Sequence, residues 1–210
     1  MTTQLLIARH GNTFATGDML TRVGARTDLP LVESKKGIAI GRYLLARSFI
    51  PSIVFSSPLK RTMETARLAL RAADLDEGLI QVDERFREID YGPDENQPEE
   101  VVVQRVGEVA IAEWNDKAIV PPGWDLDPGA IEATWIDFAE SLATNYSGQQ
   151  VLVVTSNGVA RFSPIISGGS EALKASLGVE HLKIGTGHLC LFEKPVEGSP
   201  WRCIFWNKKP

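Results

Sequence analysis

The sequence has little of what metal sites and disulfide frameworks require. Its 210 residues include only two cysteines, Cys190 and Cys203. Both lie in apolar segments typical of strands, so we expect two reduced core thiols, with a disulfide between neighbouring strands as the alternative. The three histidines, His10, His181 and His188, are not spaced like ligands of one metal ion, and no Cys-x-x-Cys pair occurs. The sequence therefore predicts no metal and no cofactor.

Other absences exclude classes of partner. The net charge is −5, so no overall basic field attracts nucleic acid or an anionic membrane. No apolar run approaches the roughly 18 residues of a membrane span. The amino terminus lacks the basic start and apolar stretch of a secretory signal. We therefore expect a cytoplasmic protein without nucleic-acid or membrane partners, and the sequence leaves its oligomeric state open.

Apolar strands alternate with amphipathic helical segments along the chain, which predicts an α/β fold. Strand character is found in Gln4–Ala8, Ser52–Phe55, Ile80–Val82, Val151–Thr155, Val179–Ile184, His188–Glu193 and Arg202–Trp206. Helical spacing is found in Ser34–Ser48, Leu59–Ala73, Asp94–Val120 and Ala130–Tyr146. We predict one domain over residues 1–210, a three-layer α/β/α sandwich with a mostly parallel sheet. A small helical cap is expected at roughly residues 93–127.

Two segments are candidates for determining ligand specificity. Phe14–Glu33 has no period and contains several glycines and a proline, so it reads as a long surface loop, and such loops are often functional. The cap contains Trp114 and Trp124 beside Pro121 and Pro122. These residues either line a pocket or pack the cap, and we favour packing.

Polar residues follow three of the predicted strands, where open α/β sheets bind their ligands. The turn after Ala8 carries Arg9, His10 and Gly11. Imidazole is uncharged near neutral pH and can act as a nucleophile. Arginine binds phosphate oxygens in a forked geometry. On its own, a His-Gly pair after a strand is more often a simple polar turn.

Two further segments favour a phosphoryl-transfer site. Ser56 to Ala66 opens a helix after a strand, where free amides attract anions, and places Arg61 in the first turn. The alternative is that Arg61 is simply a solvated residue of the helix. Glu88 follows in Phe86 to Gly92 and is able to protonate a leaving oxygen and later activate water. The alternative is that Glu88 is a loop carboxylate paired with Arg85 or Arg87.

These segments together resemble the histidine phosphatase superfamily, which includes phosphoglycerate mutases and small-molecule phosphatases. Arg9-His10-Gly11 with Thr13 matches its Arg-His-Gly-x-Thr signature. The residues Ser56 to Ala66 match its Ser-x-Leu-x-Arg-x-x-x-Thr-Ala region, and Phe86 to Gly92 match the segment that carries its acid. Thr27 to Leu31 resemble the family's loop before the first helix. The similarity extends in order from the first strand to Arg161.

The resemblance implies a phosphoglycerate mutase-like fold and a metal-independent reaction on a small phosphorylated substrate, with inorganic phosphate as a further ligand. It implies that His10 is phosphorylated and that Glu88 is the proton donor. Arg9 and Arg61 would clamp the phosphoryl oxygens. We add Asn12, which lies within the signature, to the phosphate-binding candidates.

One turn departs from the family pattern. The family places a second histidine after the central strand, and the natural alignment puts Ser156 there, followed by Asn157. A hydrogen bond to a charged group contributes about 1.5–3 kcal/mol, so its loss predicts roughly 10- to 100-fold slower turnover. Ser156 and Asn157 offer replacement donors. An alternative is that His188 lends an imidazole, although a strand-end or core role is favoured. The family's Asn after the signature is replaced by Thr16.

These residues support three hypotheses about the function. The first is a metal-independent phosphomonoesterase working through phosphorylated His10. The second is a non-enzymatic sensor of phosphorylated ligands, which the serine at position 156 motivates. The third is a phosphoglycerate-type mutase, for which we find no match to additional substrate-gripping arginines, since Arg105 is the only arginine between Arg87 and Arg161.

Overall fold

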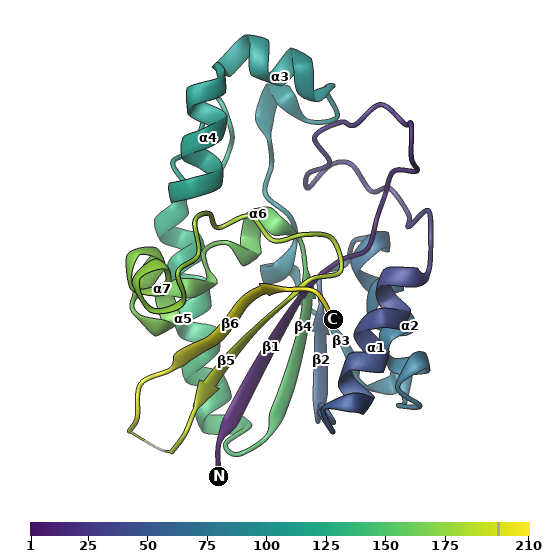
Figure 1. Ribbon diagram of the computed structural model, residues 1–210, viewed down its shortest axis with the longest axis vertical. Helices are drawn as coiled ribbons and strands as arrows, with labels where there is room; N and C mark the ends of the chain where they lie inside the picture. The colour runs from purple at the N-terminus through teal and green to yellow at the C-terminus, as the bar shows by residue number, and fades with distance from the viewer. Residues whose placement is uncertain (197) are drawn as a thin grey trace.

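The computed structural model describes residues 1–196 and 198–210, and its centre is one sheet (Figure 1). In the described residues this sheet has six strands in the order β3-β2-β4-β1-β5-β6. The strands are β1 (Thr3–Arg9), β2 (Ile53–Ser56), β3 (Ile80–Val82), β4 (Gln150–Thr155), β5 (Leu189–Lys194) and β6 (Arg202–Lys208). The first four are parallel to one another, whereas β5 is antiparallel to both β1 and β6. The prediction of an α/β fold is confirmed, and the sheet is mixed.

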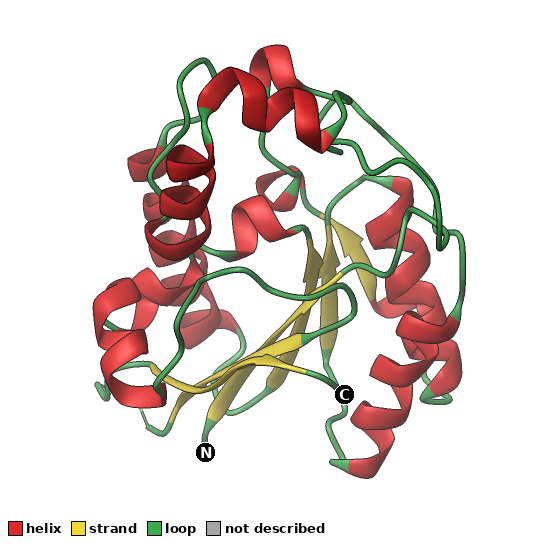
Figure 2. Cartoon of the chain, turned by 45° about the horizontal axis from the view of Figure 1, so that its top comes forward, coloured by secondary structure: helices red, strands yellow, loops and turns green. Residues whose placement is uncertain are grey.

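Helices cover both faces of this sheet, as Figure 2 shows. The helices are α1 (Lys35–Ala46), α2 (Lys60–Ala72), α3 (Glu99–Val106), α4 (Glu108–Lys117), α5 (Pro128–Asn145), α6 (Asn157–Ala160) and α7 (Gly169–Leu177). Helices α1 and α2 pack on one face, and α5 and α7 lie on the other (Figure 1). Helices α3 and α4 stand above the carboxyl ends of the parallel strands.

The alternation of side chains along β1 explains the three layers. Leu5 and Ile7 are fully buried in a core shared with α5, whereas Leu6 and Ala8 are fully buried in a second core shared with α1 and α2. Successive side chains of a strand point to opposite faces. A strand that is apolar at every position therefore needs cover on both faces, as a central strand of an α/β sheet has.

The register of the parallel strands brings the predicted turns together. Arg9 at the end of β1 pairs with Thr155 at the end of β4. Ser56 at the end of β2 pairs with Val154, one residue earlier on β4. All three strands thus end at one edge of the sheet, and the residues that follow them meet there.

Several predicted elements were wrong. Val179–Ile184 is not a strand, because the edge of β1 that it would join is occupied by β5. Its backbone bonds elsewhere: the amide of Leu182 donates to the Asn115 carbonyl (2.9 Å). Residues 94–120 are not one helix, because Gly107, with φ of 88°, separates α3 from α4. The expected turn at residues 157–158 opens the short helix α6, and α7 was not predicted.

Other expectations were confirmed. Cys190 is buried, Cys203 is half-buried, and both are free. Trp114 and Trp124 are buried and pack edge to face, with ring centroids 5.1 Å apart, so they build the cap. Residues 14–33 contain no helix or strand beyond one isolated bridge at Thr21. Within the described ranges, no helix has both the length and the apolar character needed to cross a membrane.

Candidate active site

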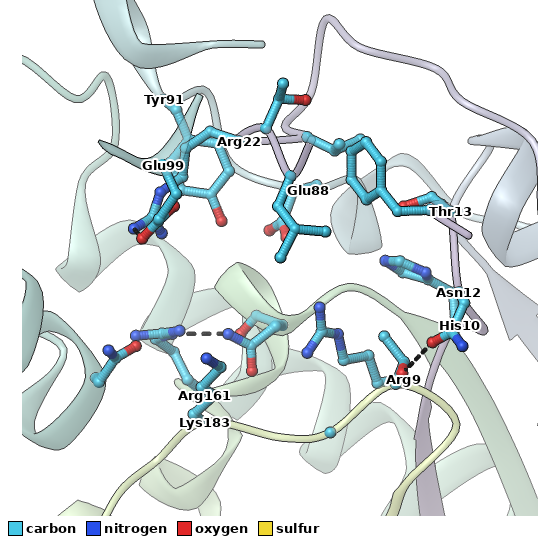
Figure 3. Close-up of a pocket in the computed structure, with 18 of the residues that line it drawn as sticks. Arg9, His10, Asn12, Thr13, Arg22, Glu88, Tyr91, Glu99, Arg161 and Lys183 are labelled. Atoms are coloured by element: carbon cyan, nitrogen blue, oxygen red, sulfur yellow. Dashed lines mark hydrogen bonds and ion pairs between the residues drawn. The ribbon is translucent and has the colours of Figure 1, made fainter. Parts of the chain in front are cut away.

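A pocket of about 620 Å³ lies beyond the carboxyl ends of β1 and β4 (Figure 3). Its walls come from these strand ends, from the loop after β1, from the cap and from the segment before β5. They include five of the seven predicted site residues: Arg9, His10, Asn12, Glu88 and Asn157. The other two, Arg61 and Ser156, are fully buried and do not line the pocket. Thr16 is also on the wall.

His10 lies on the pocket wall with one ring nitrogen already engaged. Its Nδ1 atom is 2.7 Å from the Gly11 carbonyl oxygen. A carbonyl oxygen only accepts hydrogen bonds, so the Nδ1 atom carries the proton and Nε2 keeps its lone pair in the neutral ring. Burial lowers the pKa of His10 well below the ordinary value of 6.5, and the positive charges of Arg61 and Arg9 lower it further. His10 is therefore an uncharged imidazole with Nε2 free to act as a nucleophile.

Two arginines lie near this imidazole but differ in what they bind. Arg9 donates from Nη1 to the Ile184 carbonyl (2.5 Å) and lies on the pocket wall. Arg61 donates from Nη1 to the carbonyl of Thr27 (2.8 Å) and from Nη2 to that of Gly24 (3.2 Å). Arg61 thus holds the loop after β1 in place while its charge acts on His10 from behind the pocket wall.

The carboxylate of Glu88 is fixed by two backbone amides. Its Oε1 accepts from the Ile89 amide (2.9 Å), and its Oε2 accepts from the Gly158 amide (3.1 Å). A Cβ atom at position 158 would lie 2.2 Å from Glu88 Oε1, so a side chain at this position would displace the carboxylate. Each carboxyl oxygen keeps a further lone pair for a proton. The arrangement presents a positioned carboxyl group in the same pocket as His10.

The side chain of Asn157 is oriented by the segment before β5. Its Oδ1 accepts from the Ile184 amide (2.8 Å), which leaves the Nδ2 donors toward the pocket that Asn157 lines. Asn12 is more constrained: its Nδ2 donates to Glu33 (2.7 Å), and its Oδ1 accepts from the Thr186 hydroxyl (2.5 Å). Asn157 is therefore the better placed amide donor of the two.

Several buried donors in this region have no hydrogen-bond partner among the described residues. They include Arg9 Nε, Arg61 Nε and the Ser156 hydroxyl. Unpaired buried polar groups are uncommon and destabilising. All three belong to residues that the sequence nominated as phosphate ligands, but of these only Arg9 lies on the pocket wall.

The pocket also contains cations that sequence reasoning did not nominate as site residues. Arg22 comes from the loop after β1, Arg161 follows α6, and Lys183 lies in the segment mistaken for a strand. Arg161 is 1% exposed, stacks 3.8 Å from the centre of the Trp114 ring, and burial lowers its pKa to about 10. The predicted functional character of the loop was the only sequence signal for Arg22, and Lys183 had none.

His188 does not contribute to this pocket. It lies just before β5, and its Nδ1 is 2.8 Å from Oδ1 of Asn207. The favoured strand-end role is confirmed. Among residues 1–196 and 198–210, no group of three or more His, Cys, Asp or Glu side chains is arranged to hold a metal ion.

Known proteins share both the sequence pattern and the fold. A 2,3-bisphosphoglycerate-dependent phosphoglycerate mutase of Bifidobacterium longum is 28% identical over 156 residues, which are 72% of this chain and 58% of the mutase. The match thus spans less than two thirds of that relative. A metal-independent phosphoserine phosphatase of Arabidopsis thaliana is 27% identical over 192 residues, covering 86% of this chain and 77% of the relative.

Two solved structures show the same architecture. Mycobacterial hydrolase 1 superposes with a TM-score of 0.77 at 20% identity and covers 100% of both chains. A mycobacterial glucosyl-3-phosphoglycerate phosphatase complexed with VO3 gives 0.74 at 21% identity over 98% of both. The family model of the histidine phosphatase superfamily (branch 1) matches residues 5–167. This match covers most of the chain and includes His10, Arg61 and Glu88, and the protein therefore belongs to the histidine phosphatase superfamily.

Proposed function

We propose that this protein is a metal-independent phosphomonoester hydrolase that forms a phosphohistidine on His10. The observation that carries the proposal is the pairing of an uncharged imidazole with buried donors that lack acceptors. The pKa of His10 is lowered, and Arg9, Arg61 and Ser156 each have an unpaired donor in the described structure. A phosphoryl group brings several strong acceptor oxygens and negative charge to such a site.

The first chemical step transfers the phosphoryl group to His10. The Nε2 lone pair attacks phosphorus as the bond to the ester oxygen breaks, and Glu88 gives its proton to the leaving oxygen. Arg9 and the Nδ2 donors of Asn157 bind the phosphoryl oxygens, while Arg61, which lies behind the pocket wall, contributes its positive charge. The product alcohol then leaves.

The second step returns the enzyme to its starting state. Glu88, now a carboxylate, takes a proton from water, and the water oxygen attacks phosphorus. The bond between phosphorus and Nε2 breaks, which releases inorganic phosphate and restores the neutral imidazole. Glu88 regains its proton, so atoms and charge balance over the cycle.

The test is phosphate release from an aryl phosphate in the presence of a chelator. We expect turnover by the wild-type protein and its loss in His10→Ala, because no other histidine among the described residues lines the pocket. His181→Ala is the matched control, since His181 is exposed and outside the pocket. Alkaline quenching and mass spectrometry should find a phosphoryl group on the peptide that contains His10. Equal activity of His10→Ala and wild type would refute the proposal.

A second candidate is a sensor that binds phosphorylated ligands without turnover. Ser156 is the observation in its favour, because on the alignment proposed above it replaces a histidine, and its hydroxyl is fully buried. The sensor predicts that inorganic phosphate raises the melting temperature while no phosphoester is cleaved across a broad panel. Turnover that disappears in His10→Ala would exclude it.

A mutase reading has less support in the pocket. Arg105, the single arginine available in the cap, is bound to Asp94, with 2.6 Å from Nε to Oδ1, and is not on the pocket wall. Phosphoglycerate mutases are nevertheless among the relatives. Absence of isomerisation between 2- and 3-phosphoglycerate would remove this candidate.

A further inference from the structure

The end of the pocket opposite His10 is lined by cations. Arg161 and Lys183 lie on the far side of Arg9 from His10, and Arg22 projects from the loop above them (Figure 3). These three side chains come from segments that are far apart in the sequence. The fold therefore assembles a second positive region that the phosphoryl-transfer steps do not use.

Two of these cations have no acidic partner in the described part of the chain. Arg22 is paired with Glu99, with 2.5 Å between Nη2 and Oε1. Neither Arg161 nor Lys183 has a carboxylate within ion-pair distance in the described residues. Among the described residues, Arg161 donates only to the carbonyl oxygens of Trp114 and Asn157. Buried charges are normally paired, because the loss of hydration is costly.

The charge balance of the pocket differs from that of the whole protein. The chain carries a net charge of −5, whereas the pocket wall carries four cationic side chains against two carboxylates, Glu88 and Glu99. Burial lowers the pKa of Lys183, and the neighbouring charge of Arg9 lowers it further. A single phosphoryl group beside His10 would engage Arg9 and leave the charges of Arg161 and Lys183 uncompensated.

We infer that the substrate is a phosphomonoester with a second anionic group, and that Lys183 and Arg161 bind this group at the end of the pocket opposite His10. The inference rests on the proposed function, because that function places the reacting phosphoryl group at His10. A volume of about 620 Å³ has room for both ends of such a molecule, since small-molecule pockets measure roughly 300–1,000 Å³. A carboxylate and a second phosphate offer the same chemistry here, and the experiment separates them.

Matched pairs of esters test the second group. 3-Phosphoglycerate and glycerol 3-phosphate have the same length and differ by a carboxylate in place of a hydroxymethyl group. Propane-1,3-diol bisphosphate and 3-hydroxypropyl phosphate form the corresponding phosphate pair. For at least one pair we expect kcat/KM to favour the ester with the second anionic group by about 10- to 100-fold, the range that a charge-assisted hydrogen bond supports. The pair that shows the preference identifies the second group.

The variant Lys183→Met keeps the length of the side chain and removes its charge. We expect it to reduce the preference by about tenfold. Lys174→Met is the matched control, because Lys174 lies in α7, is 3.4 Å from Glu171 and is not on the pocket wall. An unchanged preference in Lys183→Met overturns the assignment of Lys183.

Calorimetric binding of the same four esters to His10→Ala separates the two proposals. Tighter binding of the ester with the second anionic group supports the subsite even where the wild type shows no turnover. In that case only the proposed function fails. Turnover by the wild type with no preference in either pair, in binding or in kcat/KM, overturns the subsite and leaves the proposed function standing. Failure of all four esters to bind overturns the subsite as well.

Discussion

The Nδ1 atom of His10 lies 2.7 Å from the carbonyl oxygen of Gly11, and this contact decides which ring nitrogen faces the pocket. The proton sits on Nδ1, so Nε2 is the nitrogen that the proposed reaction would use. Burial adds to the effect, because it disfavours the charged imidazolium. The proposed nucleophile thus has its tautomer and its neutral charge set by the fold before any substrate binds.

The pH dependence of the His10 ring follows from this environment. A lowered pKa means that the imidazole stays neutral as the pH falls through 6.5 and becomes protonated only well below that value. An NMR titration of the His10 ring, assigned with His10→Gln, should give a midpoint well under pH 6.5. The acid limb of kcat/KM that His10 controls should lie in the same range. A midpoint at or above 6.5 would contradict the environment described.

Arg61 should change this midpoint although it is hidden behind the wall. Arg61→Met removes a positive charge that disfavours the imidazolium, so the pKa of His10 should rise and the acid limb should move to higher pH. Arg61→Lys keeps the charge and should restore most of the shift, although it loses the forked bonds to the loop carbonyls.

Arg67→Met is the control for this comparison. Arg67 lies in the same helix, α2, is half-exposed and faces Glu77. Arg67→Met should therefore leave the pKa of His10 unchanged. A purely structural role for Arg61 would lower the melting temperature in both Arg61 variants without separating their His10 midpoints.

Gly158 should be intolerant of a side chain. In Gly158→Ala the new Cβ would lie 2.2 Å from Glu88 Oε1, so the carboxylate must leave its position. General acid catalysis contributes roughly 10²- to 10⁴-fold, and we expect kcat on an aryl phosphate to fall within that range. Gly129→Ala is a close control, because Gly129 also donates its amide to a carboxylate at a helix start but is exposed. Comparable loss of activity in both variants would argue against the role of Glu88.

Much of the site was predictable because its residues lie at fixed offsets from strands. The apolar run that ends at Ala8 defines β1, and the register with β4 then brings Arg9 beside Thr155. Such motif positions follow from the chain itself. The alternation of strands and helices likewise predicted helices on both faces of the sheet, and Leu5 and Leu6 are indeed buried in different cores.

The incorrect predictions have a common physical cause. Tertiary contacts overrode the local preference of these segments for a secondary structure. Residues 179–184 have strand-like composition, yet β5 occupies the available edge, and the Ile184 amide bonds to the side chain of Asn157 instead. The same segment delivers Lys183 to the pocket. For Arg61 the local prediction was correct, since it lies in the first turn of α2. Its hydrogen bonds to the loop carbonyls of Gly24 and Thr27 could not be predicted, because they join residues that are far apart in the sequence.

Asn157 offers the sharpest test of how this pocket binds the transferring group. Asn157→Asp keeps an acceptor for the Ile184 amide, now 2.8 Å from Oδ1, but replaces the Nδ2 donors with a negative charge. Two like charges about 4 Å apart repel by about 4 kcal/mol at an effective dielectric constant near 20. Since about 1.4 kcal/mol corresponds to a tenfold change in rate, kcat/KM on an aryl phosphate should fall by about 100- to 1,000-fold. Asn145→Asp adds the same charge at an exposed position in α5 and should leave the rate unchanged. If Asn157→Asp also keeps its activity, its amide does not face the phosphoryl group, and Arg9 must bind the oxygens without it.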